Sequence, residues 1–521
     1  MHGCLAAVLV LSFCLNLFPL WWGLPALNAW AFDEIRPAAV LEGLEKRFSD
    51  GWSGPYPPLH YYLLGTLFWP VVWAEESGWL AMDALRKTTL LYLLGRFLSV
   101  LLATATVYLV YRCARLLGDR PTAVLSALIA ATIPPFVFHA KTINLEAPYL
   151  FWFMLSVFFL LRALDRHRLR DYLGLAAAAT LAICTKDQAF AFYVLVPLLL
   201  WLDLYRHSQR DPADDQPRWR TLLDRRLVLS ALLAVVLFAL VQNFLFNFEG
   251  FRRHLWMVTH RSPSLFKVYE PTLRGYGALM LQSLRHLAFA LGLPLALAGV
   301  WGAAMALRHP RQDRRMLVLL GLGVSYFVFF VLVIRHNYVR FLLPIALLVS
   351  FFAARALIEM GRSSTLPQVV TVLLVGGILL HALLRALSVD FLLHWDSRYR
   401  IEGWIASNVA AHEDAVAVGR QNLLPRGLEV VPWSRVRQRG AGYFNQRGVD
   451  YLVLSTNDLT SRRRREFYAL LSGGELGFEL KLRHRGEPPM NLLDTDGIYT
   501  NLKYLNPEIE IYKRSPESPD E

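Results

Sequence analysis

Residues 316–334 read MLVLLGLGVSYFVFFVLVI, a run of 19 residues without a charged side chain. A helix needs about 20 mostly apolar residues to cross the hydrocarbon core of a bilayer. The run is followed at once by Arg335-His336-Asn337-Tyr338-Val339-Arg340, a short polar turn with three basic side chains. This stretch therefore predicts a transmembrane helix that ends in a cationic turn.

Apolar runs recur along most of the chain, which is 55% hydrophobic and only 18% charged. Soluble globular proteins carry about 25% charged residues, so the composition excludes a single soluble domain and a disordered chain. We therefore expect an all-α polytopic membrane domain over residues 1–388. Its twelve runs lie near 3–24, 58–74, 88–111, 121–138, 147–161, 171–185, 189–204, 227–245, 287–307, 316–334, 341–358 and 367–388.

Residues 389–521 have a different texture, with 18 Lys/Arg and 19 Asp/Glu. Short strand-like runs at 415–418 and 451–454 and a helical stretch over 460–471 predict a small α/β domain. The tail from Ser515 to Glu521 is expected to be disordered. The four cysteines all precede residue 185 and fit neither a disulfide framework nor a zinc site.

The basic residues indicate which side of the membrane each loop faces, because cytoplasmic loops carry an excess of Lys and Arg. One alternating set of loops holds 18 Lys/Arg in 56 residues, whereas the other holds 15 in 105. We expect the first set to be cytoplasmic; it comprises 112–120, 162–170, 205–226, 308–315 and 359–366. The second set then lies outside and comprises 25–57, 75–87, 139–147, 186–188, 246–286 and 335–340.

This orientation requires that the run 58–74 does not cross, because loops 25–57 and 139–147 would otherwise face opposite sides. The run has only 17 residues, begins after Pro57 and contains Pro70. We interpret it as a helix that lies in the outer interface or re-enters it. The sequence thus predicts eleven crossings, a cytoplasmic N-terminus and an outer C-terminal domain.

The first apolar run, 3–24, also fits the core of a signal peptide, with a cleavage site in 25–29. It has no basic segment before it, and Trp21-Trp22 is typical of a membrane interface. We therefore expect the run to be retained as a membrane anchor.

With this topology, acids and bases from distant parts of the chain gather on the outer face. Ionisable groups at membrane depth are energetically expensive and usually mark a site. Carboxylates that can take a proton, next to cations that can hold an anionic leaving group, suit a transfer reaction. The residues are Asp33, Glu34, Tyr56, His60, Arg96, His139, Lys141, Glu146, Lys186, Arg335, His336, Tyr338 and Arg340.

Each of these residues also has a purely structural interpretation. Asp33 and Glu34 could begin an interfacial helix, Glu146 could simply open the next helix before Pro148, and Lys186 could extend to the lipid headgroups. Basic residues of the 335–340 turn could bind lipid phosphates, His60 could be a packed core histidine, and Arg96 could pair with an outer acid. The occurrence of all these residues on one side favours a functional site more strongly than any single residue does.

Four short motifs in order resemble the PMT-type GT-C glycosyltransferases. They are Asp33-Glu34 after the first helix, Pro57-Pro58-Leu59-x-Tyr61-Tyr62, Leu145-Glu146-x-Pro148 before a helix, and Thr185-Lys186 after another. This group includes protein O-mannosyltransferases, the lipid A aminoarabinose transferase and related lipopolysaccharide sugar transferases of bacteria. The resemblance covers about residues 1–390, and segments 404–408 and 448–454 are similar to the C-terminal domain of many bacterial members.

The resemblance implies transfer of a sugar from a polyprenyl-phosphate donor to an acceptor hydroxyl on a lipid, glycan or protein, by inverting single displacement. It implies that Asp33 is the general base, with Glu34 as its helper or an acceptor contact. Glu146 matches the second acidic position, and Lys186 and Arg340 match cations that face the donor phosphate. Arg335 and His336 are added on charge alone.

The resemblance also implies an outer-face site in a membrane of the cell envelope, which we expect to be the bacterial inner membrane. Some members carry a phosphate-binding Lys just before the Pro of the first outer loop, where this chain has Tyr56. His60, Arg96 or Lys141 could take that place, and His139 and Tyr338 could line the same pocket. We expect no cofactor and no metal requirement.

Other function classes stay open at this stage. A transporter or lipid flippase is disfavoured because no paired repeats are visible, and a non-enzymatic scaffold would use the basic residues for topology alone. An oligosaccharide ligase or polymerase would need a large basic outer loop. The only candidate for such a loop is 246–286, with Arg252, Arg253, His254, His260 and Arg261. The net charge of +13 is not a nucleic-acid signal, because the excess lies in the membrane part.

Overall fold

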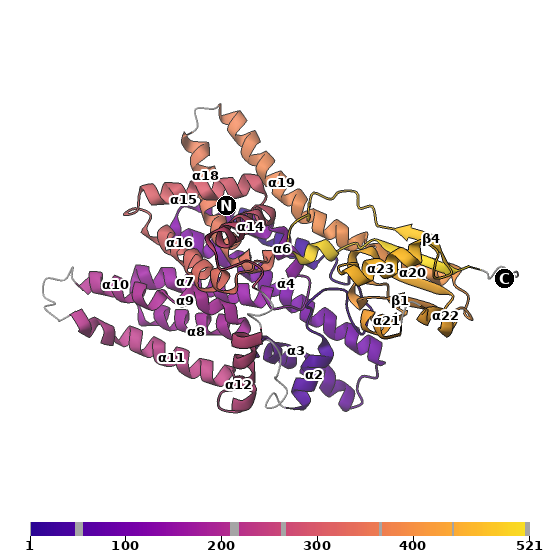
Figure 1. Cartoon of the computed structure of the whole chain (residues 1–521). Coiled ribbons are helices and arrows are strands. Elements are labelled where there is room, and N and C mark those ends of the chain that lie inside the picture. Colours follow the sequence, from indigo (N-terminus) through magenta and orange to yellow (C-terminus); the bar gives the residue numbers. More distant parts are fainter. Residues whose placement is uncertain are drawn as a thin grey trace, which may run out of the picture.

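The structure is a computed structural model that describes residues 2–46, 56–208, 218–261, 267–363, 367–439 and 442–515. The tail that we expected to be disordered lies, except for Ser515, outside the described residues. Figure 1 shows a region of long helices followed by a smaller region in which helices accompany a sheet.

The first part of the helical region runs from the N-terminus to the turn at Lys186. A long helix, α4, and two later helices, α7 and α8, pack side by side in it. The helices are α1 (His2–Leu17), α2 (Pro37–Glu45), α3 (Leu59–Glu76), α4 (Ala84–Leu117), α5 (Arg120–Ala131), α6 (Pro134–His139), α7 (Glu146–Arg166) and α8 (Leu169–Thr185).

The second part continues from the short turn η1 (Asp187–Ala189). Its helices are α9 (Phe190–Tyr193), α10 (Val196–Ser208), α11 (Arg225–Val241), α12 (Phe248–Trp256), α14 (Leu273–Leu291), α15 (Leu293–Arg308), α16 (Arg314–Tyr326), α17 (Leu332–Ile334), α18 (Leu343–Ser363) and α19 (Gln368–His394). The turns η2 (Arg218–Leu223), η3 (Met257–Arg261), η4 (Phe327–Val331) and η5 (Val339–Leu342) join some of them.

Six helices in the described part of the chain are long and apolar enough to cross a membrane. The bent pair α14 and α15, which meet at 113°, would bring the number to seven. The fold is therefore that of an integral membrane protein with several spans, as the apolar runs predicted. The predicted number of eleven crossings is not confirmed, and α3, the helix of the run 58–74, is not among the six.

Close helix packing in the membrane region depends on small residues. A Cβ atom on Gly302 of α15 would lie 2.1 Å from the carbonyl oxygen of Phe352 in α18. Because lipid tails are as apolar as the side chains, helices in a bilayer associate mainly through such close van der Waals contact. The α15–α18 pair places the start of α18, and with it η5, at a fixed point of the bundle.

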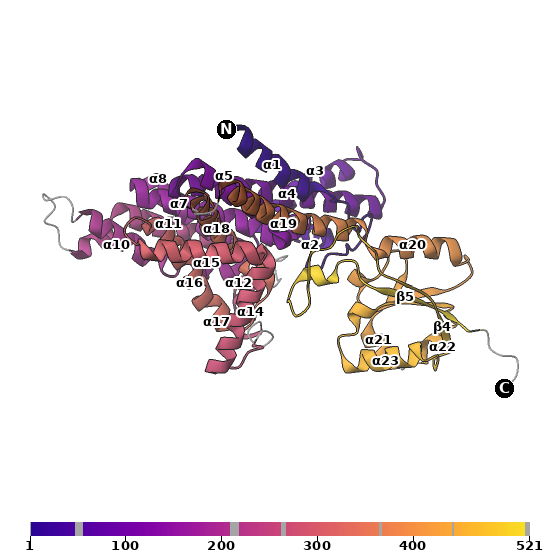
Figure 2. The ribbon, with the colours of Figure 1, turned by 90° about the horizontal axis from the view of Figure 1, so that it is seen from above.

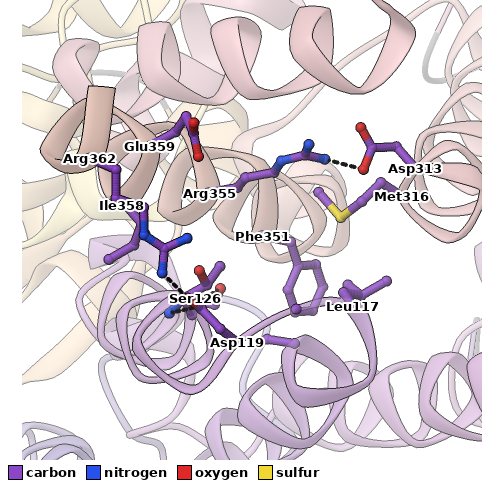
Figure 3. Close-up of a pocket in the computed structure, with 13 residues that line it drawn as sticks. Leu117, Asp119, Ser126, Asp313, Met316, Phe351, Arg355, Ile358, Glu359 and Arg362 are labelled. Carbon is purple, nitrogen blue, oxygen red and sulfur yellow. Dashed lines mark hydrogen bonds and ion pairs between the residues drawn. The ribbon is translucent and has the colours of Figure 1, made fainter. Parts of the chain in front are cut away.

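The ends of α5, α16 and α18 that lie away from η5 surround a polar cavity of about 290 Å³ (Figure 3). Arg355 of α18 pairs with Asp313 at 2.6 Å, and Arg362 pairs with Asp119. These ion pairs join three helices at the face that the basic loops predict to be cytoplasmic. They join the bundle at the end opposite to η5.

The predicted α/β region is present and contains a five-stranded sheet of order β2-β1-β3-β5-β4. The first three strands are mutually parallel, and β5 pairs antiparallel with both β3 and β4. Figure 2 shows α20 on one side of the sheet and α21, α22 and α23 on the other. The bounds are α20 (Ser397–Asn408), β1 (Ala415–Val418), η6 (Gln421–Leu423), β2 (Glu429–Val431), α21 (Trp433–Arg439), α22 (Tyr443–Arg447), β3 (Tyr451–Ser455), η7 (Thr456–Asp458), α23 (Arg462–Ser472), β4 (Phe478–His484), η8 (Asn501–Tyr504) and β5 (Ile509–Arg514).

The two regions are joined by more than the chain connection. Trp22 of the first outer loop donates its indole N–H to Asp396 at 3.1 Å, and the guanidinium of Arg398 lies 4.2 Å from the ring centre of Trp30. Between β4 and β5 the chain returns to the helices, where Leu493 and Leu502 are buried in the helical core. The sheet region is therefore held against the loop between α1 and α2 and against the helices.

Candidate active site

The segment that carries Asp33 is fastened from several directions. Asp33 has a left-handed backbone with φ of 62°, which is uncommon for a residue with a side chain. Two residues later, the backbone N–H of Ile35 donates to the carbonyl of Ile143 at 2.7 Å. Asn422 of the sheet region donates to the carbonyl of Ala31 at 3.3 Å. These contacts hold the segment that carries the Asp33 carboxylate at one position between the helices and the sheet region.

Glu34 points into the protein and pairs with Arg96 of α4. The guanidinium donates from Nε and Nη2 to the two carboxylate oxygens at 2.8 and 2.9 Å, and both side chains are buried. The backbone N–H of Ile143 also donates to Glu34, and Arg96 donates to the carbonyls of Leu20 and Trp22. Arg96 is therefore the structural partner of an outer acid, one of the two roles considered from the sequence.

Asp33, Arg340, Glu146 and Lys186 form a continuous row of alternating charge. Arg340 donates from Nη1 to Asp33 Oδ2 at 2.5 Å, and its Nε lies 3.7 Å from Glu146 Oε1. Lys186 donates from Nζ to the same Glu146 oxygen at 2.5 Å. The Asp33 side chain is 45% exposed, whereas that of Glu146 is only 4% exposed. The row thus runs from an accessible carboxylate to a buried ion pair.

The row is assembled from the ends of helices. Glu146 lies in the first turn of α7, where a carboxylate is favoured by the helix dipole, and Asn144 accepts from its backbone N–H at 3.0 Å. Lys186 directly follows the last residue of α8, where a cation is favoured. Arg340 lies in η5, immediately before α18. Three helix ends therefore meet beside the loop that carries Asp33.

Aromatic rings surround the two cations. The guanidinium of Arg340 lies 5.1 Å from the ring centre of Tyr338, and Lys186 Nζ lies 5.8 Å from that of Tyr149. Tyr56 lies near Arg340, Asp33 and Glu146, and burial raises the pKa of its phenol to about 12. Tyr56 is thus a neutral donor or acceptor at physiological pH, at the position where some related sequences carry a Lys.

Within the turn 335–340, Arg340 belongs to the row of charges, whereas Arg335 and His336 lie beside it. Arg335 has a left-handed φ of 49°, and its carbonyl accepts from the backbone of Tyr269. Its guanidinium makes no ion pair with the residues that the structure describes. The His336 ring contacts those of Tyr338 and Tyr499, and burial lowers the pKa of His336. The structure therefore brings Arg340 to the row, and Arg335 and His336 to its border.

The remaining sequence candidates have other partners or none in the described structure. Lys141 pairs with Asp390 at 2.9 Å and donates to the carbonyl of Leu15. His139 lies 2.6 Å from the side-chain nitrogen of Asn144, beside the start of α7, and burial lowers its pKa to about 4. His60 is fully buried, and neither ring nitrogen has a hydrogen-bond partner among the described residues.

The segment 497–504 contributes contacts that sequence reasoning missed. Tyr338 donates its hydroxyl to Asn501 at 2.7 Å, and the backbone N–H of Val339 donates to the carbonyl of Tyr499 at 2.9 Å. The ring of Tyr504 lies 4.4 Å from that of Phe32, next to Asp33. No motif marks this segment, because its role depends on the return of the chain from β4 to the helices.

The basic loop 246–286 reaches the site region through one of its basic residues. His254 Nε2 lies 3.1 Å from Asp187 Oδ1, next to Lys186. Arg252 and Arg253 instead pair with Glu249 of their own helix, α12. Among the described residues, no group of three or more His, Cys, Asp or Glu side chains is placed to hold a metal ion.

The comparisons with known proteins agree with the helical fold and with the motifs. Residues 92–213 match the family model described as dolichyl-phosphate-mannose-protein mannosyltransferase. No curated protein matches the chain in sequence.

Two of the following solved structures resemble the chain over most of its length, and a third over about half. The oligosaccharyltransferase of Archaeoglobus fulgidus tethered with an acceptor peptide is 12% identical with a TM-score of 0.50, over 95% of this chain and 74% of that one. ArnT from Cupriavidus metallidurans bound to undecaprenyl phosphate is 16% identical with a TM-score of 0.45, over 98% and 97%. The S. cerevisiae protein O-mannosyltransferase Pmt1-Pmt2 complex is 18% identical with a TM-score of 0.36, over 48% and 34%.

The family match begins at Tyr92 and so includes Arg96, Glu146 and Lys186, three of the residues whose partners are described above. Residues 92–213 therefore carry the sequence signature of a PMT-type membrane glycosyltransferase with a lipid-phosphate sugar donor, which confirms both the resemblance drawn from the motifs and the predicted enzyme class.

Proposed function

We propose that the protein transfers a sugar from a polyprenyl-phosphate donor to an acceptor hydroxyl at the outer face of a membrane. The observation that supports this most is the row Asp33–Arg340–Glu146–Lys186. It joins two carboxylates and two cations from chain segments up to 307 residues apart. A base and fixed cations side by side are what displacement of a phosphate leaving group requires.

Asp33 is the general base in this proposal. It is the most exposed carboxylate of the row, so an acceptor can approach it. Asp33 takes the proton of the acceptor hydroxyl while that oxygen attacks the anomeric carbon from the face opposite the phosphate. The bond between the anomeric carbon and the phosphate oxygen breaks, polyprenyl phosphate leaves with the electron pair, and the sugar is inverted.

Arg340 and Lys186 offset the charge that grows on the leaving phosphate. Arg340 contacts both carboxylates of the row, so an arriving donor phosphate competes with Asp33 for the same guanidinium. Release of Asp33 from Arg340 would leave the carboxylate free to accept a proton. Donor binding and activation of the base are coupled in this way.

Glu146 and Glu34 act as positioning residues. Glu146 is buried and holds Lys186 and Arg340 at a common place, and its carboxylate has little room for an acceptor. Glu34 uses both oxygens for Arg96 and a backbone N–H, and so fixes the turn before and after Asp33. Asp33 is the only one of the three acids to which we assign a proton transfer.

The topology of eleven crossings is part of the proposal, with the N-terminus inside, a membrane domain over 1–388 and an outer domain over 389–521. Five helices of the eleven have only 12 to 17 residues, namely α1, α5, α8, α11 and α15. A span usually needs about 20 residues, so these would cross together with the residues that flank them. The proposal also places the protein in the bacterial inner membrane. It further takes the reaction to be independent of metal ions.

Comparison of envelope glycans and lipids by mass spectrometry tests the function. Cells without the gene should lack a sugar substituent that returns with the wild-type gene and does not return with Asp33→Asn at equal membrane abundance. A glycome that does not change when the gene is deleted would contradict a transferase. Uptake of a solute by proteoliposomes of the purified protein would instead favour transport.

A further inference from the structure

The outer domain contains a cavity of about 640 Å³ that the transfer mechanism does not use. It lies between α21 and α23, which share one face of the sheet (Figure 2). Small-molecule sites in proteins are typically clefts of about 300–1,000 Å³. The cavity is therefore large enough for one or two sugar rings.

The cavity lies at the edge of the sheet where open α/β folds bind ligands. Strands β1, β2 and β3 are parallel, so their carboxyl ends share one edge. Trp433 follows the end of β2, and Ser461 and Arg464 follow the end of β3. In parallel sheets, ligands bind outside the carboxyl ends, where neighbouring connections leave in opposite directions. The cavity begins beside this edge, at the first residues of α21 and α23, and extends along these two helices.

A buried carboxylate holds the wall of the cavity in place. Asp458 is 1% exposed and accepts from the indole N–H of Trp433 at 2.7 Å and from Arg464 Nη1 at 2.7 Å. Arg420 pairs with the same carboxylate at 3.1 Å. The Trp433 ring also packs edge-on against Phe467. The aromatic surface is thus fixed before any ligand arrives, which reduces the entropy lost on binding.

The charge of the cavity is strongly positive. Arg437 of α21 and Arg463 of α23 line it, and neither forms an ion pair or side-chain hydrogen bond within the described structure. The single acid at the wall, Glu466, is already paired with Arg462 at 2.8 Å. Guanidinium groups recognise phosphate and carboxylate through paired hydrogen bonds. The cavity therefore suits an anion.

We propose that this cavity binds an anionic saccharide, that is, a sugar that carries a phosphate or a carboxylate. The Arg464 guanidinium lies over one face of the Trp433 ring at 5.5 Å from its centre, and the other face stacks on the C–H face of a sugar ring. Arg437 and Arg463 bind the anionic group, and the hydroxyls of Ser434 and Ser461 bond to the ring hydroxyls. The site then holds the acceptor of the reaction, an assignment that rests on the proposed transferase function, whereas the binding itself does not.

Calorimetric titration of the full-length protein in phosphatidylcholine nanodiscs tests the site, with glucose 1-phosphate as probe. Glucose 1-phosphate should bind at least about ten-fold more tightly than glucose or inorganic phosphate. The variant Arg437→Gln/Arg463→Gln should weaken it about ten-fold or more, with the melting temperature preserved because both arginines are exposed. The matched control is Arg439→Gln/Arg465→Gln, one exposed arginine from each of α21 and α23, which removes the same charge outside the cavity and should change the affinity less than about two-fold.

Four results would overturn the proposal. Equal affinity for inorganic phosphate would exclude the sugar contact, and equal affinity for glucose would exclude the anionic one. An equal loss in the control variant, or loss of binding when phosphatidylglycerol replaces phosphatidylcholine, would assign the arginines to the membrane surface. If glucose 1-phosphate binds but Asp33→Asn retains transfer, only the transferase mechanism is contradicted. If Asp33→Asn abolishes transfer but glucose 1-phosphate does not bind, only the saccharide site is contradicted.

Discussion

At the scale of single residues, the position of Asp33 is set by its backbone and by the contacts of its neighbours in the chain. The left-handed backbone at Asp33 and the pairing of Glu34 with Arg96 turn one acid outward and the other inward. Two adjacent carboxylates therefore have different environments, and only that of Asp33 is available for proton transfer. This division of roles could not be read from the pair Asp33-Glu34 alone.

Asp33→Asn keeps the shape of the side chain and one acceptor oxygen but removes its charge and its basicity. We expect sugar transfer to fall by about 10²–10⁴-fold, the usual contribution of a general base, with no loss of membrane abundance. The measurement is product formation in isolated membranes that contain donor lipid. Asp496→Asn, an exposed acid of the outer region, is the control and should retain full transfer. Near-full transfer by Asp33→Asn would refute the base assignment.

His139 should make the stability of the protein depend on pH. Burial lowers the pKa of His139 to about 4, so the folded protein leaves the ring neutral while the unfolded chain still binds a proton near pH 6. The free energy of unfolding is therefore undiminished above about pH 6.5 and falls as the pH drops towards 4. Thermal melts at pH 7 and pH 5 should differ less in His139→Gln than in wild type. The exposed His412→Gln should leave the difference unchanged, and an unchanged difference in His139→Gln would contradict this account.

At the scale of secondary-structure elements, the segment 497–504 supports the turn that carries Arg340. The bond from Tyr338 to Asn501 and the backbone bond from Val339 to Tyr499 join this segment to η5. A hydrogen bond of this kind contributes about 0.5–1.5 kcal/mol. The segment therefore acts on the site through the position of Arg340, without itself touching the row.

Asn501→Ala tests this support. Loss of the Tyr338–Asn501 bond should reduce transfer by about three- to ten-fold through a less well placed Arg340, since about 1 kcal/mol corresponds to roughly five-fold. The change should weaken donor binding, measured from the dependence of the rate on donor lipid concentration. Asn408→Ala, at the exposed end of α20, should have no such effect. An equal effect in both variants would show that the contact is not specific.

The ion pairs at the other end of the bundle should affect stability and leave catalysis unchanged. Arg355→Leu leaves Asp313, a largely buried acid, without its partner. Because Arg355 is itself partly exposed, we expect a loss of about 1–3 kcal/mol, less than for a fully buried pair. Thermal unfolding in detergent should show the loss, while transfer per folded molecule stays at the wild-type level. Asp313→Leu added to Arg355→Leu should recover stability, and failure to do so would assign the effect to packing.

At the scale of the whole molecule, the site joins the membrane helices to the outer sheet region. Trp22 and Asp396 bind each other, Arg398 covers Trp30, and Leu493 and Leu502 are buried among the helices. The sheet region is thus part of the structure that holds the loop between α1 and α2. We propose that it also carries a site for the acceptor, so that one rigid unit presents both substrates.

Labelling of single cysteines in intact cells tests the proposed topology. In a background without the four natural cysteines, a membrane-impermeant maleimide should label a cysteine at His412 but not one at Arg311 until the membrane is opened. Both positions are exposed in the structure, so access depends on the side of the membrane alone. Labelling of position 311 in intact cells, or protection of position 412, would contradict the predicted orientation.

Much of the fold follows from local patterns, and these could be read directly. Long apolar runs predict helices that cross a membrane, because an unpaired backbone cannot lie in lipid. The change of composition near residue 389 and the short strand-like runs predict the α/β region. The exact number of crossings does not follow in the same way, because α5 and α8 are shorter than a full span and depend on their neighbours for burial.

The sequence by itself determined the membrane class, the α/β outer region, the family resemblance and the acids and bases from which a site could be built. Only the tertiary structure decided that Glu34 and Lys141 have buried partners, and that Asp33, Arg340, Glu146 and Lys186 form one row. Only the structure showed that segment 497–504 supports Arg340 and that Trp433 and two unpaired arginines share a cavity. The physical reason is range: hydrophobic patterning and helix signals act between neighbours in the chain, whereas charge pairing depends on distances in space that no local pattern contains.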